Sequence, residues 1–214
     1  MKNLALTFFV LLCAGCARDA DPVPFDRPGL LALLPDGLSA PVEHADRHIL
    51  VVRHARKISD DCNALDCPLS PEGEAMVASL ASLIGAPPVD AAYSSAACRT
   101  LRTAEAGGLA VVVHQAADGL ESGCTAEDQV ERSRADAFAE ASSSDLRWTL
   151  VAEHSNTSCQ WIVEFAGEAA AGQAGCTDGR LPDDAYGDIY WLYRDQGDWH
   201  VTVLPGAFDT SAAG

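Results

Sequence analysis

The residues best suited to chemistry stand at the end of an apolar run, in the segment 49–57. Residues 49–52 have the composition of a strand buried on both faces, and the chain then changes to Arg53-His54-Ala55-Arg56-Lys57. In an open α/β sheet, ligands bind beyond the carboxyl ends of the strands. A neutral imidazole can act as a nucleophile, and a guanidinium can bind phosphate oxygens with parallel donors. A strand that ends in a solvated basic turn is the alternative for this segment alone.

Two further basic side chains follow predicted strands in the same way. Arg99 comes shortly after one strand, and His154 comes directly after another. Because the carboxyl ends of parallel strands lie at one edge of a sheet, both are expected to converge on Arg53 and His54. A single histidine after a strand is most often a surface residue. Two histidines with two arginines at equivalent strand ends instead predict a site for a small anion.

Strands and helices alternate along the chain, which predicts an α/β fold with three layers, α/β/α, and a mostly parallel central sheet. The closing strands are expected to form a hairpin around residues 195–198 and to add an antiparallel edge. Irregular structure is expected over residues 167–184, which are rich in glycine and alanine. The expected strands are residues 49–52, 90–94, 109–114, 148–152, 188–193 and 199–204, and the main helices begin near Ser70, Ser95, Glu127 and Thr157.

The first residues have the pattern of an export signal, with Lys2 ahead of an apolar run over residues 4–12. The run is too short for a comfortable membrane-spanning helix and ends in Ala14-Gly15-Cys16. This junction resembles that of a bacterial lipoprotein, with residues 1–15 removed as a signal peptide and lipid attached to Cys16. An ordinary secretory signal is the alternative. We therefore expect an exported protein of the periplasm or cell surface, held to a membrane by its lipid.

The remaining chain is expected to contain one folded domain. Residues 16–46 are rich in proline and are predicted to form an extended tether, residues 47–205 the domain, and residues 206–214 a mobile tail. The formal net charge of −17 argues against binding to nucleic acid. A local cluster of basic residues in such an acidic chain is suited to a small anion.

Six cysteines remain after the signal and the lipidation site, and an even number in an exported chain predicts disulfides. No Cys-x2-Cys pair indicates a zinc site. Sequence alone leaves many pairings open, and free buried thiols are the alternative. A local bridge is easy for the first two, and the second pair should meet at the sheet edge, so the favoured pairs are Cys62 with Cys67, Cys98 with Cys124, and Cys159 with Cys176.

Four segments, in order, resemble the histidine phosphatase superfamily, which includes phosphoglycerate mutases and small phosphohistidine phosphatases. They are residues 50–57 (LVVRHARK), 68–74 (PLSPEGE), 93–104 (YSSAACRTLRTA) and 151–157 (VAEHSNT). The resemblance covers about residues 47–205. It implies a hydrolase, without a metal or other cofactor, that acts on a small phosphorylated substrate. The substrate would be a phosphomonoester or a phosphohistidine, hydrolysed through a phosphohistidine intermediate.

The resemblance also implies catalytic roles for the converging residues. His54 matches the nucleophile, Arg53 and Arg99 match groups that hold the phosphate, and His154 matches a donor to the phosphoryl oxygens. The chemistry supports these roles, because imidazole is both a nucleophile and a fair leaving group. Preplaced cationic groups stabilise the charge on a transferring phosphoryl group.

Further residues near these positions have less definite roles. Lys57 is expected to add to the positive field and to bind substrate, whereas Arg56 is interpreted as a solvated loop charge. The family uses a carboxylic acid to protonate the leaving oxygen, and Glu121 matches its pattern better than Asp118. The alternative is that water or the substrate supplies this proton.

Two departures from the family pattern affect the expected function. Glu153 stands where the family usually has a small residue; its side chain should point away from that of His154, and would repel phosphate if it did not. The segment that forms a substrate-specific cap in larger members is short, so the natural substrate cannot be read. A protein of another class, a non-catalytic anion-binding envelope lipoprotein that retains the fold, is the alternative to the phosphatase.

Overall fold

The computed structural model describes residues 26–115, 124, 131–143 and 145–211, and within them the strands form one sheet. The order is β4-β3-β2-β5-β1-β6-β7. The first five strands in this order are parallel, and β6 and β7 add an antiparallel hairpin to β1, which confirms the predicted sheet. The strands are β1 (Arg47–Arg53), β2 (Ala91–Ser94), β3 (Val112–Gln115), β4 (Glu131–Ser133), β5 (Trp148–Glu153), β6 (Ile189–Asp195) and β7 (Asp198–Leu204).

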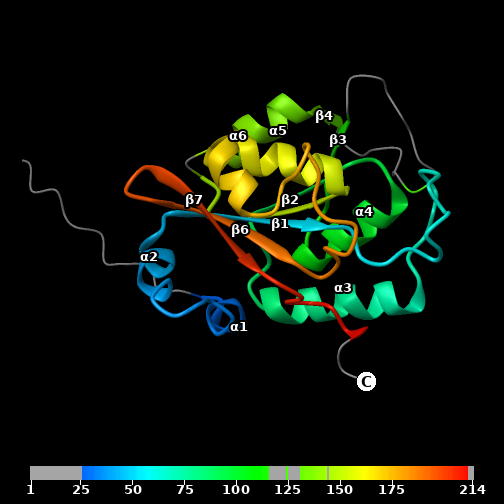
Figure 1. Cartoon of the computed structure of the whole chain (residues 1–214), viewed down its shortest axis with the longest axis horizontal. Helices are drawn as coiled ribbons and strands as arrows, with labels where there is room; N and C mark the ends of the chain where they lie inside the picture. Colours follow the sequence, from blue (N-terminus) through cyan, green and yellow to red (C-terminus); the bar gives the residue numbers. More distant parts are fainter. Residues whose placement is uncertain (1–25, 116–123, 125–130, 144, 212–214) are drawn as a thin grey trace, which may run out of the picture.

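Helices cover both faces of this sheet, with α5 and α6 on one side and α3 on the other (Figure 1). The pleat of β1 divides its apolar residues between the two layers: Leu50 and Val52 pack on the α3 side, and Ile49 and Val51 on the α6 side. This explains why β1 is apolar without alternation. The helices are α1 (Pro28–Leu31), α2 (Ser39–His44), α3 (Pro71–Ile84), α4 (Cys98–Ala104), η1 (Glu105–Gly107), α5 (Arg134–Ala141) and α6 (Ser155–Gln173).

Helix α3 begins as predicted, and its first turn lies against the segment that follows β1. The Ser70 side chain caps the helix by accepting the Gly73 N–H at 3.0 Å. A Cβ at Gly73 would lie 2.1 Å from the Arg56 carbonyl oxygen, so only glycine permits this approach. The sequence Ser-Pro-Glu-Gly therefore brings the start of α3 against the turn that contains His54.

Two helix boundaries differ from the prediction. Helix α5 was expected to begin near residue 127, but it begins at Arg134 because Ser133 caps it, accepting the Asp136 N–H at 3.1 Å. Residues 131–133 instead pair with β3 as a short edge strand, and residues 127–130 lie outside the described part. Helix α6 continues past its kink at Gly167 (φ 82°) to Gln173, because the alanine-rich continuation is a good helix former.

The prediction for the segment that precedes β1 needs a correction for residues 26–46, which are folded rather than extended. Leu30 and Val42 are fully buried in the core on the α3 side. The buried Arg27 guanidinium donates to the carbonyl oxygens of Ile84, Pro87 and Pro88. The prolines that indicated a tether include Pro28, which instead occupies the first position of α1, where proline is favoured.

The end of the chain differs from the prediction in the same way. Phe208 is fully buried, and its N–H donates to the Gly187 carbonyl at 3.0 Å. Asp209 follows and forms an ion pair with Arg56 at 3.1 Å. The predicted mobile tail is therefore wrong for residues 206–209, because an apolar anchor and an ion pair hold them against the domain.

The docked segment before β1 yields a stability prediction. Leu30→Ala should lower the free energy of unfolding by about 2–5 kcal/mol, because it removes a fully buried leucine and leaves a cavity. Leu33→Ala is the matched control, since Leu33 is 41% exposed and its loss should have little effect. Chemical denaturation of both variants measures the difference, and equal stabilities would show that the segment does not contribute to the fold.

All three predicted disulfides are present: Cys62–Cys67, Cys98–Cys124 and Cys159–Cys176. The first lies in the loop after His54, the second joins the start of α4 to Cys124, and the third joins α6 to the segment after it. Among the described helices, none has the length and apolar character needed to cross a membrane.

Candidate active site

His54 stands one residue past the end of β1, and its backbone is held on two sides. Its N–H donates to the Glu153 carbonyl at 2.8 Å, and the next N–H, that of Ala55, donates to Thr103 Oγ1 at 3.0 Å. His54 Nδ1 lies 2.8 Å from the Ala55 carbonyl, to which it can only donate. In the neutral ring this assigns the proton to Nδ1 and leaves the lone pair on Nε2.

His154 lies beside His54, at the junction of β5 and α6. The two ring centroids are 5.3 Å apart at an interplanar angle of 75°. Burial, together with the charges of Arg99 and Arg53, lowers the pKa of His54 to about 3 and that of His154 to about 4. Both imidazoles are therefore neutral near pH 7 when no anion is bound.

Both predicted phosphate-binding arginines are anchored on backbone carbonyls. Arg99 Nη1 donates to the Ala64 carbonyl at 2.8 Å, and Arg53 Nη1 donates to those of Pro182 and Asp183 at 3.2 and 2.6 Å. Within the described part of the chain, Nε of each is buried without a hydrogen-bond partner. Because Nε and Nη2 share one edge of a guanidinium, each arginine keeps donors on that edge for an oxyanion.

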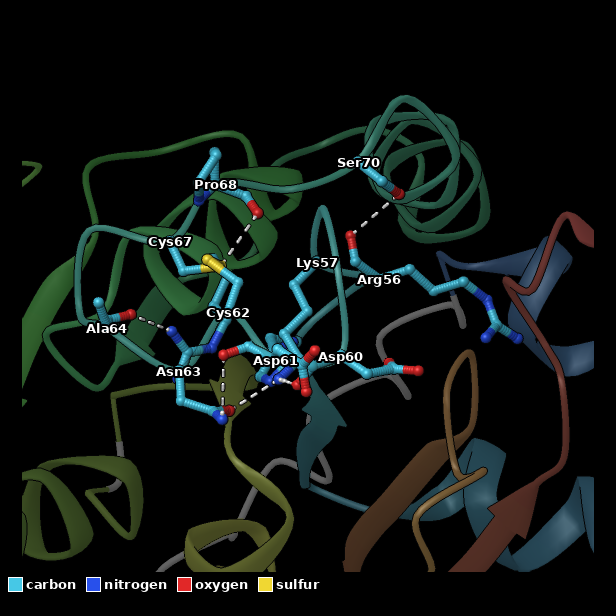
Figure 2. Close-up of a disulfide and its surroundings, with 12 residues drawn as sticks. Arg56, Lys57, Asp60, Asp61, Cys62, Asn63, Ala64, Cys67, Pro68 and Ser70 are labelled. Atoms are coloured by element: carbon cyan, nitrogen blue, oxygen red, sulfur yellow. Dashed lines mark hydrogen bonds between the residues drawn. A yellow bond between two sulfur atoms is a disulfide. The ribbon is translucent and has the colours of Figure 1, made fainter.

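The loop between β1 and α3 is closed by its own contacts. Figure 2 shows Lys57 extending toward Asp60 and Asn63, and the disulfide of Cys62 and Cys67 beside them. Lys57 Nζ donates to the Asp60 carbonyl at 2.7 Å and to Asn63 Oδ1 at 2.8 Å. The disulfide spans the stretch that includes Ala64, whose carbonyl receives Arg99. This compact loop therefore positions Arg99, and the structure gives Lys57 a role in closing it.

Arg56 was interpreted as a solvated charge, and this interpretation is wrong. Its guanidinium forms ion pairs with Glu72 and Asp209, both at 3.1 Å, and lies over the Tyr186 ring at 5.0 Å. It therefore joins the start of α3 to the end of the chain. No local pattern around Arg56 indicates Asp209, which is 153 residues away.

Tyr186 is a residue of the site that the sequence analysis missed. Its hydroxyl accepts from Arg53 Nη2 at 3.1 Å, and the Arg53 guanidinium lies 4.0 Å from the ring centroid. Its ring centroid is 5.9 Å from that of His54. The residue lies between the segment predicted as irregular, residues 167–184, and the strand predicted from residue 188, and no periodicity or motif marks it. Its tyrosine type just before β6 is the only signal.

The Glu153 side chain points away from the two histidines, as predicted. Its carboxylate is buried toward α6, where it accepts from Trp161 Nε1 at 3.1 Å and from Thr157 Oγ1 at 2.7 Å. Its other neighbour is His114, whose Nε2 lies 2.7 Å away. The sequence analysis did not identify His114, because it lies inside a predicted strand. Glu153 therefore does not face the site as a carboxylate that repels phosphate.

The candidate acids Glu121 and Asp118 lie outside the described residues. Cys124, three residues after Glu121, is bonded to Cys98, which directly precedes Arg99. Among the residues that the structure describes, no cluster of three His, Cys, Asp or Glu side chains could hold a metal ion. What the described residues assemble is two anchored guanidiniums beside two neutral imidazoles, one with a free lone pair on Nε2. This arrangement can bind an oxyanion and attack it.

Comparison with known proteins gives a family match for one segment and several similar solved structures. Residues 49–122 match the family described as the histidine phosphatase superfamily (branch 1), and a search of curated proteins gave no match. Among solved structures, the phosphoglycerate mutase of Bacillus anthracis str. Sterne is 13% identical with a TM-score of 0.52, and the match covers 80% of this chain and 99% of that chain. The protein of open reading frame Rv3214 from Mycobacterium tuberculosis is 18% identical with a TM-score of 0.50, covering 75% and 97%.

A third solved structure, the alpha-ribazole phosphatase of Shigella flexneri, is 15% identical with a TM-score of 0.49, covering 75% of this chain and 96% of that one. At such identities the two structures with higher scores show the shared fold alone. The matched segment 49–122 contains the Arg53-His54 turn and Arg99. Residues 49–122 are therefore similar to the histidine phosphatase superfamily (branch 1), and the fold of the described domain is similar to that of the two structures with the higher scores.

Proposed function

We propose that this protein is a metal-independent phosphatase that hydrolyses a small phosphomonoester or a phosphohistidine through a phosphohistidine at His54. The observation that carries the proposal is the state of His54. It is buried, neutral near pH 7, and bonded through Nδ1 to the Ala55 carbonyl, so Nε2 has a free lone pair. A nucleophile must be unprotonated, and His54 Nε2 is unprotonated without the help of an adjacent base.

In the first step, the Nε2 lone pair attacks phosphorus and forms an N–P bond as the bond to the leaving group breaks. That bond is P–O in a phosphomonoester and P–N in a phosphohistidine. Arg99 and Arg53 stabilise the charge on the phosphoryl oxygens through their Nε donors, which have no partner among the described residues. His154, beside His54, donates a further hydrogen bond to one of these oxygens. Its low pKa in the free site rises when a phosphate dianion lies next to it.

In the second step, water attacks the phosphorus and the N–P bond breaks, which regenerates neutral His54 and releases phosphate. The departing oxygen in the first step needs a proton, and the attacking water in the second step must lose one. A carboxyl group can do both, as general acid and then as general base. We assign this role to Glu121, with Asp118 as the other candidate in the same segment.

Glu121→Gln should slow substrates with poor leaving groups by roughly 10²–10⁴-fold and leave aryl phosphates nearly unchanged, because aryl oxides leave without protonation. Rates with an alkyl phosphate and with p-nitrophenyl phosphate measure this contrast. A comparable loss on both substrates would assign Glu121 a structural role. The same selective loss in Asp118→Asn would move the acid to Asp118.

Hydrolysis of p-nitrophenyl phosphate by the folded domain in the presence of EDTA tests the proposed reaction. Turnover that persists with EDTA and disappears in His54→Ala is the expected result. Binding of inorganic phosphate without any turnover would instead favour the non-catalytic anion-binding lipoprotein. A screen of small phosphorylated metabolites then identifies the substrate.

Attachment to a membrane through a lipid on Cys16 is a further part of the proposal. It is supported by the apolar run over residues 4–12 and the small residues Ala14 and Gly15 before the cysteine. Residues 17–25 would then connect the anchor to the folded segment that starts at residue 26. Release of Cys16→Ser from the membrane fraction supports the anchor, and an unmodified mature N-terminus at another residue contradicts it.

A further inference from the structure

Glu153 is linked to the backbone of both candidate histidines, directly to that of His54 and through Thr157 to that of His154. Its carbonyl oxygen accepts the His54 N–H at 2.8 Å. Its carboxylate Oε2 accepts from Thr157 Oγ1 at 2.7 Å, and the same Thr157 oxygen accepts the His154 N–H at 3.1 Å. One residue therefore connects the end of β1 to the first turn of α6.

The other carboxylate oxygen is held by groups outside the candidate site. Glu153 Oε1 accepts from Trp161 Nε1 at 3.1 Å and lies 2.7 Å from His114 Nε2. His114 belongs to β3, which is separated from β5 by β2 in the sheet. The side chains of Glu153 and His114 are both 0% exposed. A carboxylate is retained at such depth only when its neighbours offset its desolvation. Here Trp161 and Thr157 each donate a hydrogen bond to one of its oxygens, and the His114 ring lies against Oε1.

The carboxylate is ionised at neutral pH. Burial raises the pKa of Glu153, but the attraction of His114 and the hydrogen bonds from His114 and Thr157 outweigh it and bring the pKa to about 2. Arg134, on α5, acts in the same direction. A fixed negative charge therefore lies one residue before His154.

The negative charge of Glu153 raises the pKa of His154, whereas burial and the neighbouring positive charges lower it. Burial lowers the pKa of His154 most, and the charges of Arg99 on α4, Arg53 on β1 and Lys57 in the following loop lower it too. Glu153 is the group that raises it. Protonated His154 would be the stronger donor to a phosphoryl oxygen, so this opposing charge favours the form that binds an anion.

We propose that Glu153 is a positioning residue for His154, which fixes the first turn of α6 through Thr157 and favours the protonated imidazole through its charge. His114 and Trp161 hold the carboxylate in place from β3 and α6. The inference rests on the proposed function in one respect, the role of His154 as a donor to the phosphoryl group. The inference gives a role to Glu153, which stands where the family pattern usually has a small residue. A large side chain is compatible with the site here because it lies on the face of β5 opposite the histidines.

NMR titration of the His154 ring, with and without saturating inorganic phosphate, tests the electrostatic part in the wild type and in Glu153→Gln. The amide has nearly the same shape and no charge, and its single oxygen can accept from Thr157 or from Trp161 but not from both. His154 should therefore titrate at lower pH in the variant, and the descending limb of kcat/KM should move to lower pH with it. An unchanged His154 titration overturns this part.

Thr157→Val tests the mechanical part, because valine keeps the branched shape and removes the hydroxyl. Phosphate affinity and kcat/KM should fall by roughly 10–100-fold, the scale found for groups that orient metal-bound histidines. Thr157→Ser should restore both, since it keeps the hydroxyl. If Thr157→Val binds phosphate as tightly as the wild type, the mechanical part is overturned. This result does not depend on whether Glu153→Gln folds. The His154 titration and the phosphate affinity can both be measured without turnover. If the wild type hydrolyses no substrate, the proposed function is refuted, but these two measurements still decide the inference about Glu153.

Discussion

Replacement of His54 by alanine is expected to lower kcat by at least about 10⁴-fold, the scale of losing a covalent nucleophile. The reason is that His54 Nε2 is the unprotonated lone pair that the site directs at an anion, and no other group in the described site matches it. His154 lies beside it, and its proposed role is to donate to a phosphoryl oxygen. Steady-state hydrolysis of p-nitrophenyl phosphate measures the loss.

His200→Ala is the matched control, because it also removes an imidazole but from an exposed position on β7. It should hydrolyse the substrate at the wild-type rate. Both variants should unfold near the wild-type midpoint, so that lost activity reports chemistry and not folding. A His54→Ala protein that keeps even a tenth of the wild-type kcat would exclude His54 as the nucleophile.

Removal of the Arg99 guanidinium should have the second largest effect, a fall in kcat of roughly 10²–10³-fold, as for the loss of one donor that stabilises a developing oxyanion. Arg99 is 7% exposed and is fixed by the Ala64 carbonyl, so its open edge is preorganised. Arg99→Lys should recover only part of the loss, because a single ammonium cannot reproduce the planar fork.

Arg102→Ala provides the control on the same helix. Arg102 is exposed and pairs with Glu74 and Glu105, so its loss changes surface ion pairs that contribute at most about 1 kcal/mol each. Its kcat should match the wild type. Kinetics across leaving groups for all three variants separates the effects, and equal losses in Arg99→Ala and Arg102→Ala would contradict a specific role for Arg99.

The sequence analysis predicted the parallel part of the sheet because each of its inner strands is a short apolar run that ends abruptly in polar residues. The same feature predicted that His54, Arg99 and His154 meet, since sheet geometry brings equivalent strand ends together. The disulfides followed from this arrangement, because the segments around Cys98 and Cys124 had to be neighbours. These predictions rely on local pattern and topology, which a single sequence contains.

The predictions that failed depend on contacts between segments far apart in the chain. The segment of Arg27 and Leu30 resembled a tether because its prolines are visible locally, whereas its docking on α3 is not. The burial of Phe208 and the ion pair of Arg56 with Asp209 could not be predicted for the same reason. The His114–Glu153 contact crosses an intervening strand, and no spacing in the sequence indicates it.

The covalent intermediate is the central claim, and trapping it is the most direct test. Wild-type protein mixed briefly with phosphorylated substrate and quenched in base should yield a peptide containing residues 53–56 that carries one phosphate on His54, stable in base and lost in acid. This peptide is expected in the wild type, should accumulate when the second step is slowed, and should be absent in His54→Ala. Phosphate mapped to any other residue, or turnover at the wild-type rate with no phosphopeptide at early times, would contradict it.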